Sequence, residues 1–311
     1  MHGFLNIDKP VGMTSFDVIR RIRRLLPRKT KIGHLGTLDP MASGVLPLAV
    51  GDATRLLSFL GEETKSYVAT MILGGVSDTQ DAWGTISPTP HHLVSSEEML
   101  QTLPAFTGII RQIPPMYSAV HHQGRRLYEL ARQGLEVERI PREIEIYQLE
   151  VLELNQNEPN QQARIRVVCS KGTYVRTLCH DIGASLGTGA YMTDLLRTRS
   201  GAFSLEQAYR LDDIMERGIR EEDLLPLDYP LAHLPEVVLN QAADVRTVLH
   251  GGSLSWSGSP PAGLLKIYAF PRILLGIGAC SGEQPEVIIR PIRVLAGSQS
   301  SQAQFIDKEL Y

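Results

Sequence analysis

A glycine-punctuated loop at positions 33 to 40 constrains the fold of this 311-residue chain more than any other stretch. The loop reads GHLGTLDP, and an apolar segment typical of a buried strand follows it at Val45 to Val50. Pro40 disfavours a helical conformation at Asp39, and the loop glycines allow turns that other residues resist. The sequence therefore predicts that Asp39 projects from a stiff turn, in a loop that also holds His34. An Asp-Pro pair that only starts a turn is the simpler alternative.

Cationic residues gather immediately before this loop. The chain as a whole has a net charge of -3, so it is not a general polyanion binder, and any nucleic-acid site must come from local clustering. Positions 20 to 31 hold seven cations and no acid, namely Arg20, Arg21, Arg23, Arg24, Arg28, Lys29 and Lys31. We predict that Arg20, Arg24 and Lys31 bind a nucleic acid; a solvated helix face is an equal alternative.

The cysteines and the N-terminus indicate the cellular setting. Cys169, Cys179 and Cys280 show no C-x-x-C or zinc-ligand spacing, which predicts reduced thiols without disulfides or a structural metal. The N-terminus lacks a cationic start followed by an apolar run, and no later stretch is long and apolar enough to cross a bilayer. We therefore expect a soluble, cytoplasmic protein.

Hydrophobic periodicity predicts both helices and strands, and a shift in composition at 225–235, where Pro and Leu are concentrated, predicts a domain boundary. Before the boundary, strands are expected at 4–7, 45–50, 65–73, 144–154, 163–169 and 190–199. Helices are expected at 15–26, where Thr14 and Asp17 have capping-box spacing, at 52–60, at 95–103, before Gly134, before Gly187 and at 204–215. Beyond the boundary, a short helix and turn at 237–252 and strands at 264–268, 273–279 and 287–294 predict a small β domain.

Several catalytic motifs are missing from the sequence. It has no HExxH zinc motif, no GxxxxGK[ST] phosphate loop and no GxSxG nucleophile elbow. Asp78 and Asp81 lack the spacing of a calcium loop and are predicted to build a turn. One well-presented carboxylate therefore remains, with basic surfaces near it in the sequence.

Asp39, Arg176 and Tyr67 form a set that suits a nucleoside within RNA. A carboxylate must be ionised to act as nucleophile or base, and Arg176, at a strand-to-helix junction, is the candidate for its bidentate partner. A stacked target base must flip into a pocket at a cost of a few kcal/mol, which contact with Tyr67 and His34 can offset. Cations interleaved with aromatics at 121–134 suit a surface that contacts phosphates and bases, or an ordinary amphipathic helix.

Five sequence blocks carry a resemblance to a known family. In order along the chain they read LNIDKPVGMTS, GHLGTLDPMASGVLPLAVGDATRL, KSYVATMILGGVSDTQDAWG, PPMYSAVHHQGRRLYELARQG and SKGTYVRTLCHDIG. With these blocks the chain resembles the bacterial tRNA pseudouridine-55 synthases, the TruB family, over roughly residues 3 to 215. The blocks are long and occur in the family's order, so the resemblance is specific. Leu35 departs from the pattern, because many members carry Thr there.

This resemblance implies an α+β pseudouridine synthase fold, with a mixed, largely antiparallel central sheet flanked by helices. The catalytic domain would span residues 1–230, with a thumb-like RNA-gripping insertion at 114–140. A small PUA-like RNA-binding β domain would span 235–296, followed by a disordered tail at 297–311.

The resemblance also implies an activity, the conversion of uridine 55 in the T-loop of tRNA to pseudouridine. A monomer would bind the T-arm and act without cofactor or metal. Asp39 matches the catalytic aspartate, Arg176 its paired arginine, Tyr67 the tyrosine that packs on the uracil, and Leu195 the apolar residue lining the uracil pocket. His34 matches the histidine that occupies the space of the flipped base, and Arg125, Arg126 and Tyr174 are expected to contact RNA.

Three routes stay open for Asp39: attack on uracil C6, attack on ribose C1′, or removal of a ribose proton. A non-catalytic tRNA-folding chaperone that uses the same basic surface is the main alternative function. A relative guided by small RNAs is disfavoured by the thumb-like block at 117–134, which is typical of a stand-alone bacterial enzyme. A structural α/β protein whose Asp39 loop is only a turn is disfavoured by the five blocks.

Overall fold

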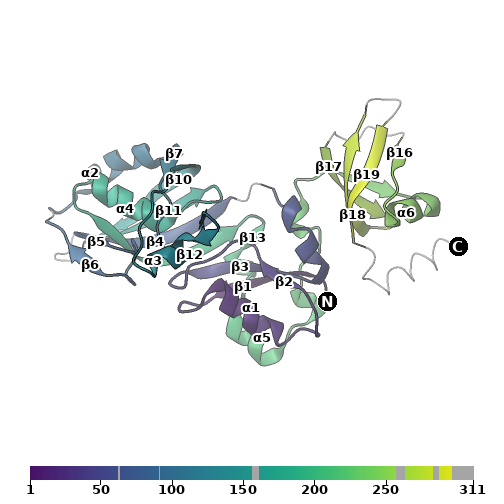
Figure 1. The fold of residues 1–311 in the computed structure, drawn as a ribbon, viewed down its shortest axis with the longest axis horizontal. Helices are drawn as coiled ribbons and strands as arrows, with labels where there is room; N and C mark the ends of the chain where they lie inside the picture. The colour runs from purple at the N-terminus through teal and green to yellow at the C-terminus, as the bar shows by residue number, and fades with distance from the viewer. Residues whose placement is uncertain (62–63, 91, 156–160, 257–262, 283–286, 296–311) are drawn as a thin grey trace.

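The computed structural model describes residues 1–61, 64–90, 92–155, 161–256, 263–282 and 287–295. Within them the chain forms a ten-stranded mixed sheet and, farther along the sequence, a five-stranded sheet that stands apart from it (Figure 1). The tail expected at 297–311 lies outside the described residues. No helix in the described part of the chain is long and apolar enough to cross a membrane.

The large sheet has the strand order β14-β1-β3-β12-β4-β11-β10-β7, with β2 paired to β3 and β13 paired to β12. Its strands are β1 (Gly3–Lys9), β2 (Ile32–His34), β3 (Ser43–Val50), β4 (Lys65–Leu73), β7 (Gly108–Gln112), β10 (Arg142–Leu154), β11 (Gln162–Cys169), β12 (Ala190–Ser200), β13 (Phe203–Ser204) and β14 (Tyr209–Arg210). The pairs β1–β14 and β3–β12 are parallel, and the other described pairs of this sheet are antiparallel. The prediction of a mixed, largely antiparallel sheet is confirmed.

One short joint connects the two halves of this sheet. Strand β12 pairs with β3 at two positions, Leu196 with Ser43 and Arg197 with Gly44. By contrast, β12 pairs with β4 along nearly its whole length. The first half carries the loop of Asp39, between β2 and β3, so this loop lies next to the joint.

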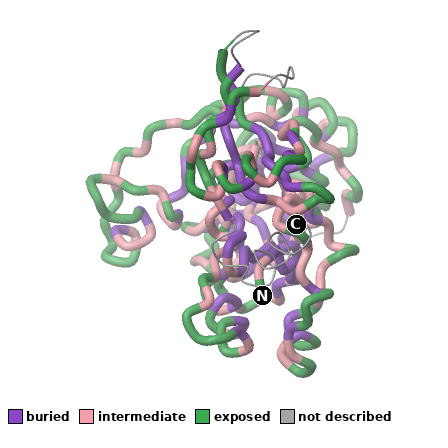
Figure 2. Tube along the Cα trace, turned by 90° about the vertical axis from the view of Figure 1, so that its right-hand side faces the viewer, coloured by how far each residue is buried: buried purple, intermediate pink, exposed green. Residues whose placement is uncertain are grey.

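Helices from both halves pack into one main core. They are α1 (Ser15–Arg23), α2 (Ser96–Thr102), α4 (Val175–Ser185) and α5 (Leu211–Arg217), while α3 (Leu127–Ala131) lies in the predicted thumb. In α1, Val18, Ile19 and Ile22 recur at helical spacing and are buried. The predicted capping box is confirmed, because the Thr14 hydroxyl accepts the Asp17 amide and the Asp17 carboxylate accepts the Thr14 amide. Buried positions follow the strands through the middle of the molecule (Figure 2).

Shorter elements complete this part of the chain. Two hairpins are formed by β5 (Gly75–Ser77) with β6 (Ile86–Pro88) and by β8 (His121–His122) with β9 (Arg125–Arg126). The 3-10 helices are η1 (Gly51–Arg55), η2 (Leu57–Phe59), η3 (Leu103–Phe106), η4 (Leu205–Gln207), η5 (Glu221–Asp223) and η6 (Tyr229–Leu231).

The small sheet has the order β15-β17-β18-β19-β16 and its own core. Its strands are β15 (Glu236–Leu239), β16 (Leu254–Trp256), β17 (Gly263–Ala269), β18 (Ile273–Ser281) and β19 (Val287–Val294), accompanied by α6 (Ala242–Leu249). Phe59 of η2 and Ile277 of β18 belong to one buried cluster, and the Tyr268 hydroxyl donates to Asp228 Oδ2 at 2.6 Å. The small sheet is therefore anchored to the first part of the chain by apolar and polar contacts.

Three predicted helices are wrong in part. The helix expected at 204–215 begins only at Leu211, because β13, η4 and β14 occupy most of residues 203–210 and β14 pairs with the distant strand β1. The segment 237–252 begins as strand β15, whose Val237 and Leu239 are buried in the second core. Two 3-10 helices replace the helix expected at 52–60; the N-cap residue of the first is Val50, and Asp52 in its first turn pairs with Arg55 at 3.6 Å.

Candidate active site

The backbone on both sides of Asp39 is held by hydrogen bonds. The Ser15 hydroxyl at the start of α1 accepts the Leu38 amide at 2.8 Å and donates to the Leu38 carbonyl at 3.1 Å. The Gly12 amide donates to the Pro40 carbonyl at 2.8 Å. The turn that the Asp-Pro pair predicts is therefore fixed to α1 and to the end of β1, and it presents the Asp39 side chain.

Arg176 reaches this carboxylate from the first turn of α4. Its Nη1 lies 2.7 Å from Asp39 Oδ2, with the two side chains 6% and 33% exposed. Its Nη2 donates to the Tyr117 carbonyl at 2.6 Å, which ties the predicted thumb to the same guanidinium. A charge-assisted contact of this kind fixes the position of a carboxylate.

Asp81 is a second carboxylate at Arg176 that the sequence reasoning missed. Its predicted role in a turn is confirmed, because Oδ1 accepts the Trp83 amide at 3.0 Å. Its other oxygen, Oδ2, lies 3.5 Å from Arg176 Nη1. Asp81 is 5% exposed, so Arg176 is flanked by one buried and one partly exposed carboxylate.

Lys9 is a further cation near Asp39, and it is completely buried. Its ammonium donates to the carbonyls of Pro10 at 3.0 Å and Met13 at 2.8 Å. Burial lowers the pKa of Lys9 from 10.5 to about 8, although the Asp39 charge opposes this shift. Lys9 lies in the LNIDKPVGMTS block, but the sequence analysis assigned it no role, because its hydrogen-bond partners are backbone carbonyls.

The Lys9 pKa predicts a pH dependence of stability. Between pH 8 and 10.5 the unfolded chain binds more protons at this position than the folded chain, so the free energy of unfolding should rise with pH. In Lys9→Met the free energy of unfolding should rise less with pH over this window, because the variant has no titratable group at position 9. Urea unfolding of both proteins at several pH values across that window measures the difference. Equal pH slopes for the two proteins would contradict the prediction.

Tyr67 and Leu195 lie on neighbouring strands of the second half-sheet. Both are buried, and Tyr67 is the register partner of Arg197 while Leu195 is the partner of Ala69. Burial raises the pKa of the Tyr67 phenol, while the Arg197 charge opposes this rise, so the phenol is neutral at pH 7. These two side chains therefore provide buried, uncharged surface in the half-sheet that β12 joins to the strand following the Asp39 loop.

His34 ends β2 and is half-buried. Burial lowers the pKa of its ring, and the charges of Arg197 and Lys65 lower it further, so the imidazole is neutral at pH 7. Its Nδ1 has no hydrogen-bond partner among the described residues. A neutral ring with an unused polar atom is available for contact with a ligand.

The predicted RNA-binding cations occupy two separate regions. Arg24 and Lys31 line a groove of about 1160 Å³, together with Arg23, Leu26, Pro27, Arg28, Lys29, Thr30, Ile32, Gly33, Thr54 and Leu57. Arg20 is exposed, pairs with Asp17 at 3.2 Å and lies over the Phe16 ring. The groove joins the end of α1 to β2, the strand that leads into the Asp39 loop.

The remaining predicted contacts lie at the thumb and at α4. Arg125 and Arg126 are exposed on β9, and the Arg126 guanidinium lies 5.9 Å from the centre of the Tyr128 ring. Tyr174 is the N-cap of α4, and the Arg176 guanidinium lies 5.8 Å from the centre of its ring. Tyr174 is therefore adjacent to the Asp39–Arg176 pair, whereas Arg125 and Arg126 belong to a separate hairpin.

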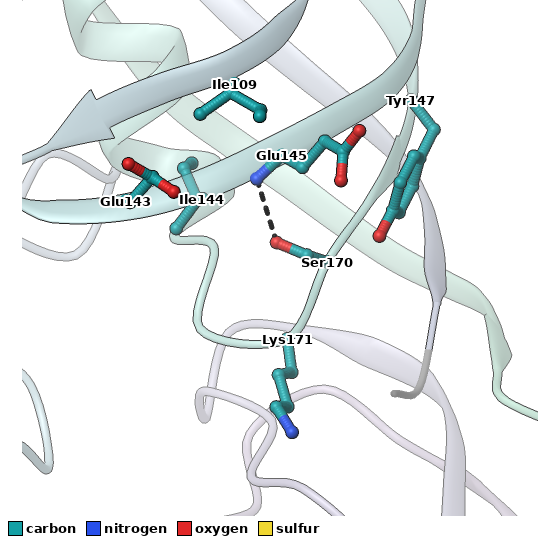
Figure 3. Close-up of a pocket in the computed structure, with 7 residues that line it drawn as sticks. All are labelled: Ile109, Glu143, Ile144, Glu145, Tyr147, Ser170 and Lys171. Atoms are coloured by element: carbon teal, nitrogen blue, oxygen red, sulfur yellow. Dashed lines mark hydrogen bonds between the residues drawn. The ribbon is translucent and has the colours of Figure 1, made fainter. Parts of the chain in front are cut away.

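A second hollow of about 240 Å³ lies at the other end of the large sheet (Figure 3). It is lined by Ile109, Glu143, Ile144, Glu145, Tyr147, Ser170 and Lys171. None of the predicted site residues lines it, and its two glutamates disfavour a phosphate ligand. Among the described residues, no group of three or more His, Cys, Asp or Glu side chains is placed to hold a metal ion.

Two protein-family models match the chain one after the other. The N-terminal domain of the TruB family pseudouridylate synthases matches residues 23–175, and the tRNA pseudouridylate synthase B C-terminal domain matches residues 176–233. The chain belongs to the TruB family. The resemblance drawn from the five sequence blocks is thus confirmed. The small sheet of this TruB family member, from Glu236 onward, lies beyond both matched ranges.

Similar proteins extend the match over nearly the whole chain. The chain is 51% identical over 295 residues to tRNA pseudouridine synthase B of Syntrophomonas wolfei, covering 94% of this chain and 98% of that protein. It is 44% identical over 304 residues to tRNA pseudouridine synthase B of Moorella thermoacetica, covering 94% and 99%.

Solved structures with the same fold contain RNA or partner proteins. A chain of an H/ACA RNP bound to a substrate RNA containing 2′-deoxyuridine is similar with a TM-score of 0.68 and 30% identity, covering 94% of this chain and 84% of that chain. A chain of a Cbf5-Nop10-Gar1 complex is similar with a TM-score of 0.69 and 31% identity, covering 94% and 84%. The predicted pseudouridine synthase fold is confirmed.

Proposed function

We propose that this TruB family member converts uridine 55 in the T-loop of tRNA to pseudouridine. The observation that carries the proposal is the Asp39–Arg176 contact at 2.7 Å, made in a loop whose backbone is held on both sides. The name of its relatives, tRNA pseudouridine synthase B, supports tRNA as the substrate. Similarity to a chain of an H/ACA RNP bound to a substrate RNA supports an RNA target.

The reaction rearranges one nucleotide without adding or removing a group. The bond from uracil N1 to ribose C1′ breaks, the uracil rotates, and a bond from C5 to C1′ forms, while the C5 proton leaves to solvent and N1 takes up a proton. Asp39 starts the reaction as a carboxylate, by attack on C6, by attack on C1′ or by removal of a ribose proton. Arg176 holds the carboxylate in place during these steps.

The pocket must retain free uracil until it is recaptured. In the proposed complex, Tyr67 packs on the flipped uracil and Leu195 lines the pocket, and burial of both side chains supports a site that excludes water. His34 takes the space that the flipped base leaves in the T-loop, and its neutral ring suits contact with neighbouring bases.

Other parts of the chain bind the rest of the tRNA in this proposal. The insertion at 114–140, which contains the β8–β9 hairpin, grips the T-arm, and its Tyr117 carbonyl contacts Arg176. The small sheet at 235–296 acts as a PUA-like RNA-binding module. We further propose that the enzyme works as a cytoplasmic monomer without cofactor or metal.

Tritium release tests the proposed reaction directly. When tRNA carries 5-tritiated uridine, formation of the C5–C1′ bond expels the label into water. We expect release of one equivalent of tritium per tRNA, and no release when uridine 55 is replaced by cytidine. Tight tRNA binding without any release would instead favour the non-catalytic chaperone, which needs the basic groove but not Asp39.

Salt dependence tests whether the groove binds phosphates. Replacing Arg24 and Lys31 together by Gln should reduce the slope of log K for tRNA against log salt by about 1.5, because each lost phosphate contact removes about 0.7 to 0.9. Arg220→Gln is the control, since Arg220 is an exposed cation paired with Glu222 and outside the groove. Fluorescence titrations at several salt concentrations give the slopes. An unchanged slope in the double variant would remove the groove from the RNA interface.

A further inference from the structure

Arg197 occupies the joint between the two halves of the large sheet. At this joint β12 pairs with β3 at only two positions, one of which is Arg197 with Gly44. On its other side, Arg197 is the register partner of Tyr67 in β4. The joint therefore separates the half that carries Asp39 from the half that carries Tyr67 and Arg176.

The Arg197 side chain is completely buried and reaches toward the first half. Its Nε donates to the Val45 carbonyl at 2.7 Å, its Nη2 to the Gly36 carbonyl at 3.1 Å and its Nη1 to the Thr37 carbonyl at 3.4 Å. Val45 belongs to β3, whereas Gly36 and Thr37 belong to the loop that carries Asp39. One guanidinium thus connects the loop and the strand that follows it.

Two glycines lie where Arg197 approaches the first half of the sheet. A Cβ added at Gly44 would lie 2.3 Å from the Arg197 carbonyl oxygen, in a backbone with φ of +99°. Gly36 has φ of +92°, and a Cβ there would lie 3.7 Å from Arg197 Nη1. Gly44 therefore allows a backbone contact with Arg197 that a side chain would obstruct, and Gly36 supplies the positive φ that the Asp39 loop needs.

Arg197 also contacts the second half. It is the register partner of Tyr67; burial raises the pKa of that phenol, and the Arg197 charge opposes this rise. The same residue therefore touches the Asp39 loop on one side of the joint and the proposed uracil-packing tyrosine on the other.

We propose that Arg197 is a positioning residue, which sets the place of the Asp39 loop relative to Tyr67 and Arg176 across the joint between the half-sheets. The inference rests on the proposed function. Arg197 does not touch the reacting atoms; it acts through the backbone of Gly36 and Thr37. A planar fork with donors in several directions suits this role, and a lysine ammonium, as a single point, cannot replace it. Small displacements of a catalytic group lower rates more than they lower binding.

The test compares Arg197→Lys with Arg217→Lys. Arg217 makes a two-point contact with Asp223, at 2.8 and 2.7 Å, at the end of α5, so its variant also loses a guanidinium fork but outside the site. Single-turnover tritium release, tRNA dissociation constant and melting temperature are measured for each protein. We expect Arg197→Lys to lower the rate about 10- to 100-fold while the dissociation constant stays within about 2-fold. Arg217→Lys should lower the melting temperature without changing the rate.

Several outcomes would overturn the inference. One is a rate for folded Arg197→Lys within about 2-fold of the wild type. Another is a loss of both the rate and the tRNA affinity in Arg197→Lys, if Arg217→Lys shows the same two losses when its melting temperature falls by the same amount. If Arg197→Lys does not fold, Arg197→Gln is measured in its place, and failure of both to fold would make Arg197 a stability residue only. A wild-type protein that releases no tritium would instead count against the proposed function.

Discussion

Replacement of Asp39 by asparagine is expected to lower the single-turnover rate of pseudouridine formation by about 10⁴-fold or more. An amide has nearly the same shape as the carboxylate, but it cannot carry the negative charge that each of the three routes requires. Its oxygen can still face Arg176 Nη1, which lies 2.7 Å from Asp39 Oδ2. The loop backbone is held by Ser15 and Gly12, so the turn should persist in the variant.

Asp39→Asn should therefore bind tRNA nearly as well as the wild type. Tritium release and tRNA binding are measured side by side, with Asp78→Asn as control. Asp78 is a turn carboxylate whose Oδ1 accepts the Thr85 amide at 2.8 Å, so its variant changes charge without touching the Asp39 loop. Turnover by Asp39→Asn within 10-fold of the wild type would remove Asp39 from the catalytic role.

Local chemistry made part of the site predictable from the sequence. Pro40 and the loop glycines act on their own neighbours, so the turn that presents Asp39 follows from a few adjacent residues. The same holds for α1, whose capping box and buried face are encoded within one segment. The pairing of Arg176 with Asp39 joins residues far apart in the chain. Arg176 was predicted as the partner because it lies at a strand-to-helix junction and because it matches the paired arginine of the family.

The missed residues depend on contacts that no local pattern records. Arg197 binds backbone carbonyls, one of them 152 residues away, and its position follows from the register of β12 against β3. The turn explains Asp81 in the sequence, so its second contact was not expected. One carboxylate oxygen makes the turn, while the other faces Arg176, 95 residues later. Two of the errors in the fold have the same origin, since β14 pairs with β1 and β15 pairs with β17, which no pattern within β14 or β15 records.

Arg176→Lys is expected to lower the rate about 10²- to 10³-fold, the loss typical of removing one fixed donor from an active site. The Arg176 guanidinium contacts Asp39 through Nη1 and the Tyr117 carbonyl through Nη2, while Asp81 lies 3.5 Å away. A lysine ammonium is a single point on a flexible stem, so it cannot hold Asp39 and the Tyr117 carbonyl in this arrangement. The charge beside Asp39 is retained in the variant, so the loss isolates the geometry of the fork.

The control for this variant is Arg166→Lys, because Arg166 pairs with Glu150 at 3.1 Å on the exposed side of β11 and lies outside the site. Single-turnover tritium release gives the rate, and a titration with labelled tRNA gives the dissociation constant. A rate loss with an unchanged dissociation constant places the role of Arg176 in the chemical step. An Arg176→Lys rate equal to that of Arg166→Lys would mean that one positive charge near Asp39 is sufficient. The fork, with its second contact to the Tyr117 carbonyl of the thumb, would then have only a structural role.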